Sequence, residues 1–272
     1  MTHQVPAGIG TRPHSARLYD FFLGGKTNYA ADRKVAVESL RQFPHAMVAA
    51  RQNRAFMHRV VRHLARDHGM RQFLDIGTGI PTAPNLHQVA QAEQPGARVV
   101  YSDNDPLVLA HARALMNSTP EGATDYIEAD VREPEVILEH ARSTLDFSRP
   151  VALSVIALFH FLPEEDAPYG IIRHLMDALP SGSALALSHA TEEFDPEGMR
   201  RIVATYRAGG VNLTLRSHKE VLTFFEGLDL VDPGLAATCD WRLDLDTDDV
   251  PQLPGMVSPA ESGVWAGLAF KP

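Results

Sequence analysis

Residues 73–79, FLDIGTG, decide the fold, because a short apolar run leads directly into a Gly-x-Gly turn. The apolar run predicts a buried strand, and the two glycines permit a sharp turn against which a ligand can lie. Asp75, directly before the first glycine, is able to accept hydrogen bonds from a ligand or to order the turn. A helix is expected over residues 84–94, so the stretch predicts the first strand–turn–helix unit of an α/β sheet.

A second acidic strand end follows further along the chain. The strand expected over residues 98–102 runs into Asp103, which is placed to bind both vicinal hydroxyls of a ribose. A dinucleotide fingerprint requires a third glycine where this chain has Thr82. An adenosyl ligand without phosphate therefore fits the two acids better than a dinucleotide does, and an ordinary strand–turn–helix is the alternative.

Two more strand ends contribute to the same edge of the sheet. A third strand, over residues 125–128, leads to Asp130, which can reach an adenine amino group or cap the next helix. A fourth, over residues 151–156, leads through Ala157 to His160. A ligand is expected here, because the carboxyl ends of parallel strands form the crevice of such sheets.

Strands and helices alternate through the rest of the chain. Further strands are expected at residues 184–188, 228–231 and 264–270, and helices at 106–116, 134–142, 164–179, 196–207 and 219–225. The pattern predicts an α/β fold with a mostly parallel seven-stranded sheet and helices on both faces.

The chain divides into three zones. Residues 1–14 are expected to be a loose arm, residues 15–69 a helical cap, and residues 70–272 the sheet domain. In the cap, Asp32 is expected to cap a helix over residues 32–43, and a second helix covers residues 45–68.

Charge is distributed unevenly over these zones. The net charge is −9, but residues 1–72 carry 12 Lys+Arg and 4 Asp+Glu, whereas the other 200 residues carry 13 and 30. An acidic body argues against broad contact with nucleic-acid phosphates. We expect the basic zone to act as a lid in which Arg17, Arg51 or Arg54 pairs with an anionic group of the ligand.

Composition excludes several other classes. The single cysteine, Cys239, excludes a disulfide framework, and the 13 histidines are scattered, so no metal site is expected. The longest apolar run, residues 151–162, is too short to span a bilayer, and no signal pattern opens the chain. We therefore expect a cytoplasmic protein that does not bind membranes and is a monomer or a homodimer.

The motifs together resemble a known family. Residues 71–190, with LDIGTG, VVYSDNDP, EADV and ALFHFLPEED in order, resemble the core of class I S-adenosylmethionine-dependent methyltransferases. Residues 16–33, ARLYDFFLGGKTNYAADR, and 51–65, RQNRAFMHRVVRHLA, resemble a bacterial, high-GC S-adenosyl methyltransferase family formerly catalogued as a domain of unknown function. The resemblance implies a Rossmann-like fold, S-adenosyl-L-methionine as the cofactor and methyl transfer, and it names no acceptor.

The resemblance also implies a set of cofactor-binding residues at the ends of the first four strands. In chain order these are Asp75, Gly77, Thr78, Gly79, Asp103, Asn104, Asp130, Val131, Ile156 and Ala157. Asp75, Gly77 and Gly79 would cradle the methionine part, and Thr78 lies in the same turn. Asp103 would hold the ribose, with Asn104 beside the adenine. Asp130 and Val131 would meet the adenine, and the backbone of residues 156–157 would flank the sulfonium. Pro81 stands where a third glycine is common in this class.

Residues 17–29 combine aromatic side chains, a pair of glycines and several polar groups. We expect this segment to cap the cofactor and to form one wall of the substrate pocket, with packing in the core as the alternative for its aromatic residues. Tyr19, Gly25, Asn28 and, further along, Arg54 are the expected cofactor-binding residues, and Tyr29 is expected in the substrate pocket.

The catalytic residues are the least defined part of this interpretation. His160 is the candidate general base, with packing in its loop as the alternative, and it is expected in the substrate pocket with His189. Tyr19 is a second catalytic candidate. Three functions are open: methylation of a small molecule, regulation by bound S-adenosylmethionine without transfer, and an NAD-type oxidoreduction that the missing third glycine disfavours.

Overall fold

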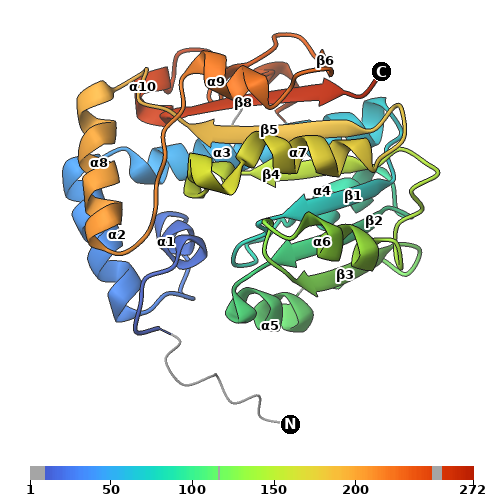
Figure 1. Ribbon diagram of the computed structural model, residues 1–272, viewed down its shortest axis with the longest axis horizontal. Helices are drawn as coiled ribbons and strands as arrows, with labels where there is room; N and C mark the ends of the chain where they lie inside the picture. The colour runs from blue at the N-terminus through green and yellow to red at the C-terminus, as the bar shows by residue number, and fades with distance from the viewer. Residues whose placement is uncertain (1–9, 116, 247–252) are drawn as a thin grey trace.

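The strand that precedes the Gly-x-Gly turn is β1 (Gln72–Ile76), in the interior of the sheet. The computed structural model describes residues 10–115, 117–246 and 253–272. Within them the strand order is β3-β2-β1-β4-β5-β8-β6, and β7 pairs with β8 (Figure 1). The other strands are β2 (Arg98–Asp103), β3 (Ala123–Glu128), β4 (Ala152–Ile156), β5 (Ala184–Ala190), β6 (Asp229–Leu230), β7 (Ala236–Ala237) and β8 (Val264–Phe270).

The sheet is mostly parallel. Strands β1 to β5 pair in parallel, β8 pairs antiparallel with β5, and β6 and β7 pair antiparallel with β8. The predicted α/β sheet is confirmed, and its last two predicted strands correspond to β6 and β8. The expected number of seven strands is one too low, because β7 has only two residues and no apolar alternation marks it in the sequence.

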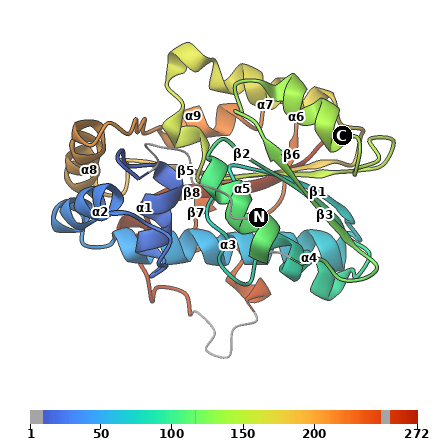
Figure 2. The same ribbon diagram turned by 90° about the horizontal axis from the view of Figure 1, so that it is seen from below.

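Helices cover both faces of the sheet (Figure 2). One face carries α6 (Pro134–Ala141), α7 (Pro168–Asp177) and α9 (His218–Thr223), and the other carries α3 (Ala46–Asp67), α4 (Leu86–Glu93) and α5 (Pro106–Leu115). Each face has its own apolar core under these helices. Successive strand residues point to opposite faces, so Leu74 lies in the core under α6, α7 and α9, and Phe73 in the core under α3, α4 and α5. Among the described residues, no helix is both long and apolar enough to cross a membrane.

A third apolar core holds the cap together beside the sheet (Figure 1). It joins α1 (Ser15–Phe22), α2 (Ala30–Gln42) and the first turns of α3 to α8 (Pro196–Ala208). The observed cap therefore includes a helix from outside the expected range of residues 15–69. This helix is α8, which packs here through Ile202 and Tyr206. The second half of α3 packs instead against the sheet, through Val60 and Leu64.

The start of the chain differs from the expected loose arm. Residues 1–9 of that arm lie outside the described residues, but residues 10–14 are docked. The His14 N–H donates to Asp32 Oδ1 at 2.9 Å. Asp32 is not the cap of α2 as expected: Tyr29 is the N-cap residue, and Asp32, three residues later, accepts its N–H at 2.8 Å. A sequence pattern places such an acid within the first turn only approximately.

The basic N-terminal zone is bound to the acidic body at several points. Arg17 Nη1 lies 2.6 Å from Asp105 Oδ2, and Arg62 Nε lies 3.8 Å from Glu93 Oε1. The buried Arg59 donates to the carbonyl oxygens of Trp241 and Thr238. Much of the local positive charge is thus used to hold α1 and α3 to the rest of the molecule.

Candidate functional site

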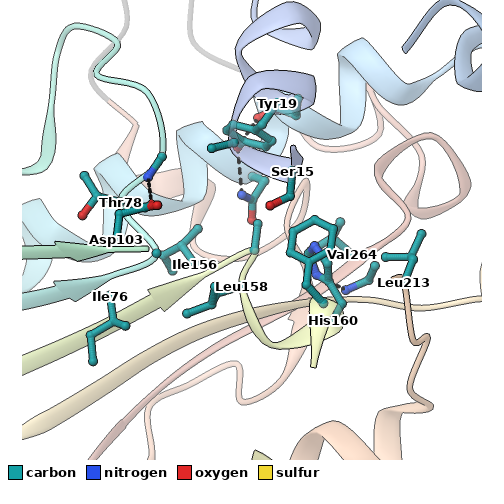
Figure 3. A pocket seen from close by; sticks show the side chains of 18 of the residues that line it. Ser15, Tyr19, Ile76, Thr78, Asp103, Ile156, Leu158, His160, Leu213 and Val264 are labelled. Atoms are coloured by element: carbon teal, nitrogen blue, oxygen red, sulfur yellow. Dashed lines mark hydrogen bonds between the residues drawn. The ribbon is translucent and has the colours of Figure 1, made fainter. Parts of the chain in front are cut away.

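A cavity of about 310 Å³ lies where the carboxyl ends of the strands face the cap. Figure 3 shows Thr78 and Asp103 on one side of it, His160, Leu213 and Val264 on the other, and Tyr19 between them on α1. The predicted site residues that line the cavity are Tyr19, Arg54, Asp75, Gly77, Thr78, Gly79, Asp103, Asn104, Asp130, Val131, Ile156, Ala157 and His160. The structure therefore brings together residues that lie far apart in the sequence.

Four predicted residues lie outside the cavity wall, namely Gly25, Asn28, Tyr29 and His189. The Asn28 side chain is buried and donates to Asp20 Oδ2 and to the Gly25 carbonyl, so both residues shape the turn after α1. Tyr29 begins α2 and packs against Gly10 and Arg17. The polar groups of this segment that suggested ligand binding are thus used within the cap itself.

The Gly-x-Gly turn has the backbone that its glycines permit. Gly77 and Gly79 have φ angles of 75° and 67°, which favour glycine. A Cβ at Gly77 would lie 2.7 Å from Leu158 Cδ1, so a larger residue would displace the Leu158 side chain in addition to straining the backbone. A Cβ at Gly79 would instead meet open space on the cavity side. The turn leaves room for a ligand to lie against its backbone.

Asp75 lies at the end of β1, on the wall of the cavity. Its Oδ1 accepts a hydrogen bond from Ser154 Oγ on β4 at 2.6 Å. Burial raises the pKa of Asp75 to about 6, although the Ser154 hydrogen bond and the Arg54 charge lower it. Asp75 is therefore ionised at neutral pH and becomes protonated in mild acid.

Asp103 joins the end of β2 to the glycine turn. Its Oδ2 accepts the Gly79 N–H and its Oδ1 accepts the Asp105 N–H, both at 2.9 Å. The side chain is buried, and burial raises its pKa. A carboxylate has about four acceptor positions. Two positions consequently remain for the two hydroxyls of a ribose.

Asp130 is much less available than its position suggests. Arg132 donates to it through Nε, Nη2 and its backbone N–H, and Asn104 Nδ2 donates at 3.0 Å. The Arg132 hydrogen bonds hold the pKa of Asp130 well below its usual range. All four acceptor positions are filled, so an adenine amino group could bind Asp130 only by displacing Asn104 or Arg132.

A chain of hydrogen bonds, one of them fully buried, links the cap to the backbone after β4. Ala157 has a φ of 55°, uncommon for a residue with a side chain, and its N–H donates to Ser188 Oγ at 2.9 Å. Ser188 Oγ donates to Asn53 Oδ1, Asn53 Nδ2 donates to the Tyr19 hydroxyl, and that hydroxyl donates to the Ala50 carbonyl. Burial raises the pKa of Tyr19. Its proton is engaged by Ala50, which does not suit a catalytic acid or base.

His160 lines the cavity from η1 (Phe159–Phe161). Its Nδ1 accepts the Ala190 N–H at 3.3 Å, so the neutral ring carries its proton on Nε2. Burial, aided by the Arg216 charge, lowers its pKa to about 3. A ring with these properties is a weak proton acceptor and a good hydrogen-bond donor.

His189 lies behind His160 and is fully buried. Its Nδ1 is 2.8 Å from the Ala190 carbonyl, and its Nε2 accepts from Arg216 Nη1 at 2.8 Å. It is therefore not a pocket residue, contrary to the sequence-based expectation. Its ring contacts both the His160 ring and the guanidinium of Arg216.

Arg216 supports that loop from beneath with all five of its N–H groups. They donate to the Phe159 and Leu162 carbonyls, to His189 Nε2 and twice to Glu164 Oε1. The side chain is buried and also lies over the rings of Tyr169 and Phe224. It determines where the loop after β4 can lie.

Arg54 remains free to bind an anionic group of a ligand. Its Nη2 donates to the carbonyls of Thr82 and Pro84, beyond the glycine turn. Among the described residues no partner contacts its Nε or Nη1, and the side chain lines the cavity. Arg17, by contrast, is engaged by Asp32 and Asp105, and Arg51 is exposed outside the cavity.

The cavity continues beyond the strand ends into an apolar chamber between η1, the cap and α8. We define this chamber by six of its lining residues: Phe22, Phe43, Phe161, Met199, Ile202 and Leu213. All six belong to the core of the cap. The cavity thus has one polar half at the strand ends and one apolar half under the cap.

Sequence reasoning missed several residues of this site. Arg132 stands two positions after Asp130 in the sequence, and this short spacing of an acid and a base could have indicated that the two side chains pair with each other. Met199, Ile202 and Tyr206 follow helical spacing that indicates a buried face, but no local pattern tells which element that face meets. Asn53 and Arg216 depend on contacts across the fold.

No group of three or more metal-ligating side chains is found in the part of the chain that the structure describes.

A family model described as S-adenosyl methyltransferase matches residues 3–272. A search of curated proteins finds no match.

Two solved structures resemble the chain along its whole length. A DUF574 family protein from Streptomyces avermitilis is 46% identical, with a TM-score of 0.91, over 97% of this chain and 99% of that one. A Thermobifida fusca protein described as a candidate methyltransferase is 37% identical, with a TM-score of 0.88, over 100% of this chain and 99% of that one. Both alignments therefore include the cap and the sheet of this chain.

Proposed function

Because the chain belongs to the S-adenosyl methyltransferase family, we propose that it transfers a methyl group from S-adenosylmethionine to a small organic molecule held under the cap. The observation that carries the proposal is the divided cavity. Its polar half suits the cofactor, and the apolar chamber beside it suits an acceptor. Apolar pockets with a few placed polar groups are typical small-molecule sites.

The polar half fits the proposed cofactor in several respects. Gly79 leaves open space beside its backbone, Asp103 has two acceptor positions left, and Asp75 is a carboxylate near the turn. Asp75 would face the ammonium of the methionine part, and Arg54 would face its carboxylate. Asp103 would accept from the ribose hydroxyls.

The protein's own contribution to the reaction is positioning and exclusion of water. S-adenosylmethionine supplies a methyl group that the adjacent sulfonium charge has already activated. The hydrogen-bond chain from Tyr19 to Ala157 holds the cap against the backbone after β4. The cap closes the apolar chamber over an acceptor, which aligns it and keeps water away. In the transfer, a bond to the methyl carbon would form at the acceptor's nucleophilic atom as the methyl–sulfur bond breaks, which would leave S-adenosylhomocysteine. His160 is a hydrogen-bond donor in this scheme, no side chain is assigned as general base, and a proton lost by the acceptor would pass to water as the product leaves.

A transfer experiment with labelled cofactor tests the proposal. The protein is incubated with methyl-tritiated S-adenosylmethionine and a cell extract separated into small-molecule, nucleic-acid and protein fractions. We expect label in the small-molecule fraction, and only when the protein is present. Label in the nucleic acid or protein fraction would contradict a small acceptor. Cofactor binding without transfer to any fraction would favour the regulatory alternative.

The pKa of Asp75 predicts how cofactor affinity depends on pH. Because that pKa is raised to about 6 and only the carboxylate attracts an ammonium, affinity should fall as pH falls through 6. Linkage gives roughly a tenfold weaker affinity for S-adenosylhomocysteine at pH 5 than at pH 7. Calorimetric titration at both pH values measures this ratio.

Two controls isolate Asp75 in that titration. The Asp75→Asn variant should bind more weakly at pH 7 and show little change between pH 7 and pH 5. Adenosine, which lacks the ammonium but keeps the ribose, should lose less affinity between pH 7 and pH 5 than S-adenosylhomocysteine does, and its loss measures the contribution of Asp103, whose pKa burial also raises. A tenfold drop that persists in Asp75→Asn would assign the titration to another group.

A further inference from the structure

Two buried polar groups border the apolar chamber without any protein partner among the described residues. Tyr206 on α8 is 7% exposed and lines the cavity, and no hydrogen bond to its hydroxyl is present there. His160 is also 7% exposed and uses Nδ1 for the Ala190 N–H, whereas its Nε2 contacts no acceptor. Neither atom is among the polar atoms that are fully shut off from solvent, and both side chains line the cavity, so a ligand there can supply the partner that the protein does not.

Both side chains contact one aromatic ring, that of Phe161. The His160 ring centroid is 4.3 Å from that of Phe161, and the Phe161 ring is 6.5 Å from that of Tyr206 and almost parallel to it. Figure 3 shows His160 beside Leu213 and Val264 at this side of the cavity. Both polar groups therefore border the same apolar space.

Charged side chains are confined to the other half of the cavity. The described Asp and Arg residues that line it are Arg54, Asp75, Asp103, Asp130, Arg132 and Asp166, and His14, which also lines it, lies 3.4 Å from Asp105 just beyond β2. Asp75, Asp103, Asp130 and Arg132 lie at or just beyond strand ends. Asp166, in η2 (Glu164–Asp166), lies 3.6 Å from Arg132 Nη1, and Arg54 is fastened to the loop after the glycine turn. Arg216, the buried cation behind His160, has its five N–H groups engaged by the protein. A charged acceptor would consequently lose hydration in the chamber without gaining an ion pair.

We propose that the chamber binds an uncharged, largely apolar molecule that carries one hydroxyl or carbonyl oxygen, held by the Tyr206 hydroxyl and His160 Nε2–H. This inference rests on the proposed function, and it specifies the class of acceptor. His160 Nε2 donates to the oxygen, and the Tyr206 hydroxyl donates to it or accepts from it. His160 thus acts as an acceptor-binding donor in place of the general base expected from the sequence.

Binding of matched probes to protein saturated with S-adenosylhomocysteine tests this inference. The probes are 2-naphthol, 2-methylnaphthalene and 2-naphthoate, which share a ring system and differ in the polar group. Calorimetry should give the highest affinity for 2-naphthol and the lowest for the anionic 2-naphthoate. The Tyr206→Phe variant should bind 2-naphthol roughly 3- to 10-fold more weakly, the usual effect of one hydrogen bond, and 2-methylnaphthalene unchanged.

The variants are chosen so that the fold is preserved. The Tyr206 hydroxyl has no partner among the described residues, so its removal should not perturb the cap. Tyr29→Phe, on a tyrosine outside the cavity, is the matched control and should leave every probe affinity unchanged.

The binding results separate failure of the proposed function from failure of this inference alone. S-adenosylhomocysteine affinity is measured first, and its absence would contradict the proposed function together with this inference. With normal S-adenosylhomocysteine binding, three results would overturn the inference alone: no binding of any probe, equal or tighter binding of 2-naphthoate, or unchanged 2-naphthol affinity in Tyr206→Phe.

Discussion

Replacing Asp103 with alanine is expected to weaken S-adenosylmethionine binding by roughly 100-fold or more. The carboxylate is the proposed acceptor for both ribose hydroxyls, and each charge-assisted hydrogen bond contributes about 1.5–3 kcal/mol. The substitution also removes the acceptor that fastens the Gly79 N–H, so the turn against which the cofactor lies should loosen. Calorimetric titration with S-adenosylmethionine measures the loss.

The neighbouring strand offers a matched control for Asp103. Glu128 pairs with Asp103 in register at the end of β3, but it is exposed and does not line the cavity. Glu128→Ala should keep wild-type affinity. Adenosine, which retains the ribose and lacks the methionine part, should lose affinity for Asp103→Ala by a similar factor. Wild-type affinity in an Asp103→Ala protein with a native circular dichroism spectrum would refute the ribose assignment.

Replacing Arg216 with methionine is expected to lower the free energy of unfolding by about 2–6 kcal/mol, the cost of two buried acceptors left without their donor. Methionine fills part of the volume but makes none of the five hydrogen bonds. The Leu162 carbonyl and His189 Nε2 would then lose their donor, each at a cost of about 1–3 kcal/mol, whereas the Phe159 carbonyl would keep the Leu162 N–H. Urea denaturation followed by circular dichroism measures the change.

The effect on function should follow from the loop that Arg216 supports. His160 lies on this loop, so 2-naphthol binding to the S-adenosylhomocysteine complex should fall, whereas S-adenosylhomocysteine affinity, set mainly by β1 and β2, should change less. Arg207→Met, on an exposed arginine of α8, is the control, with a change within about 0.5 kcal/mol. Equal stability of Arg216→Met and Arg207→Met would show that the loop is held by other contacts.

The sheet and its ligand-facing edge could be predicted because they depend on local signals. The apolar run before Gly77, and the acids that follow later runs, mark strand ends directly in the sequence. Parallel pairing then brings these ends to one edge, so the polar half of the cavity follows from the strand pattern. β7 could not be predicted, because two residues carry no periodic signal.

The apolar half could not be predicted, because its residues acquire their roles through distant contacts. α8 joins the cap core across about 140 residues of sequence, and nothing local in the sequence around Tyr206 indicates that its side chain lines a cavity. The same limit applies to polar residues that satisfy one another. Asn28 resembles a ligand-binding residue in the sequence, but the fold directs its side chain to Asp20 and Gly25.

The availability of a carboxylate also depends on the fold. Asp103 and Asp130 both follow strand ends and have similar sequence contexts. In the structure Asp103 keeps two acceptor positions, whereas Arg132 and Asn104 fill those of Asp130. Strand-end acids can therefore be located from sequence, but their free hydrogen-bonding capacity requires the structure.

A crystal structure of the complex with S-adenosylhomocysteine tests the central claim most directly, namely that the cavity is divided between cofactor and acceptor. We expect both ribose hydroxyls within hydrogen-bonding distance of Asp103, the amino-acid part beside Asp75 and Gly79, and the sulfur directed toward the apolar chamber, which stays free. An adenine or amino-acid part seated among Phe161, Ile202 and Tyr206 would contradict the account, because no chamber would then remain for an acceptor.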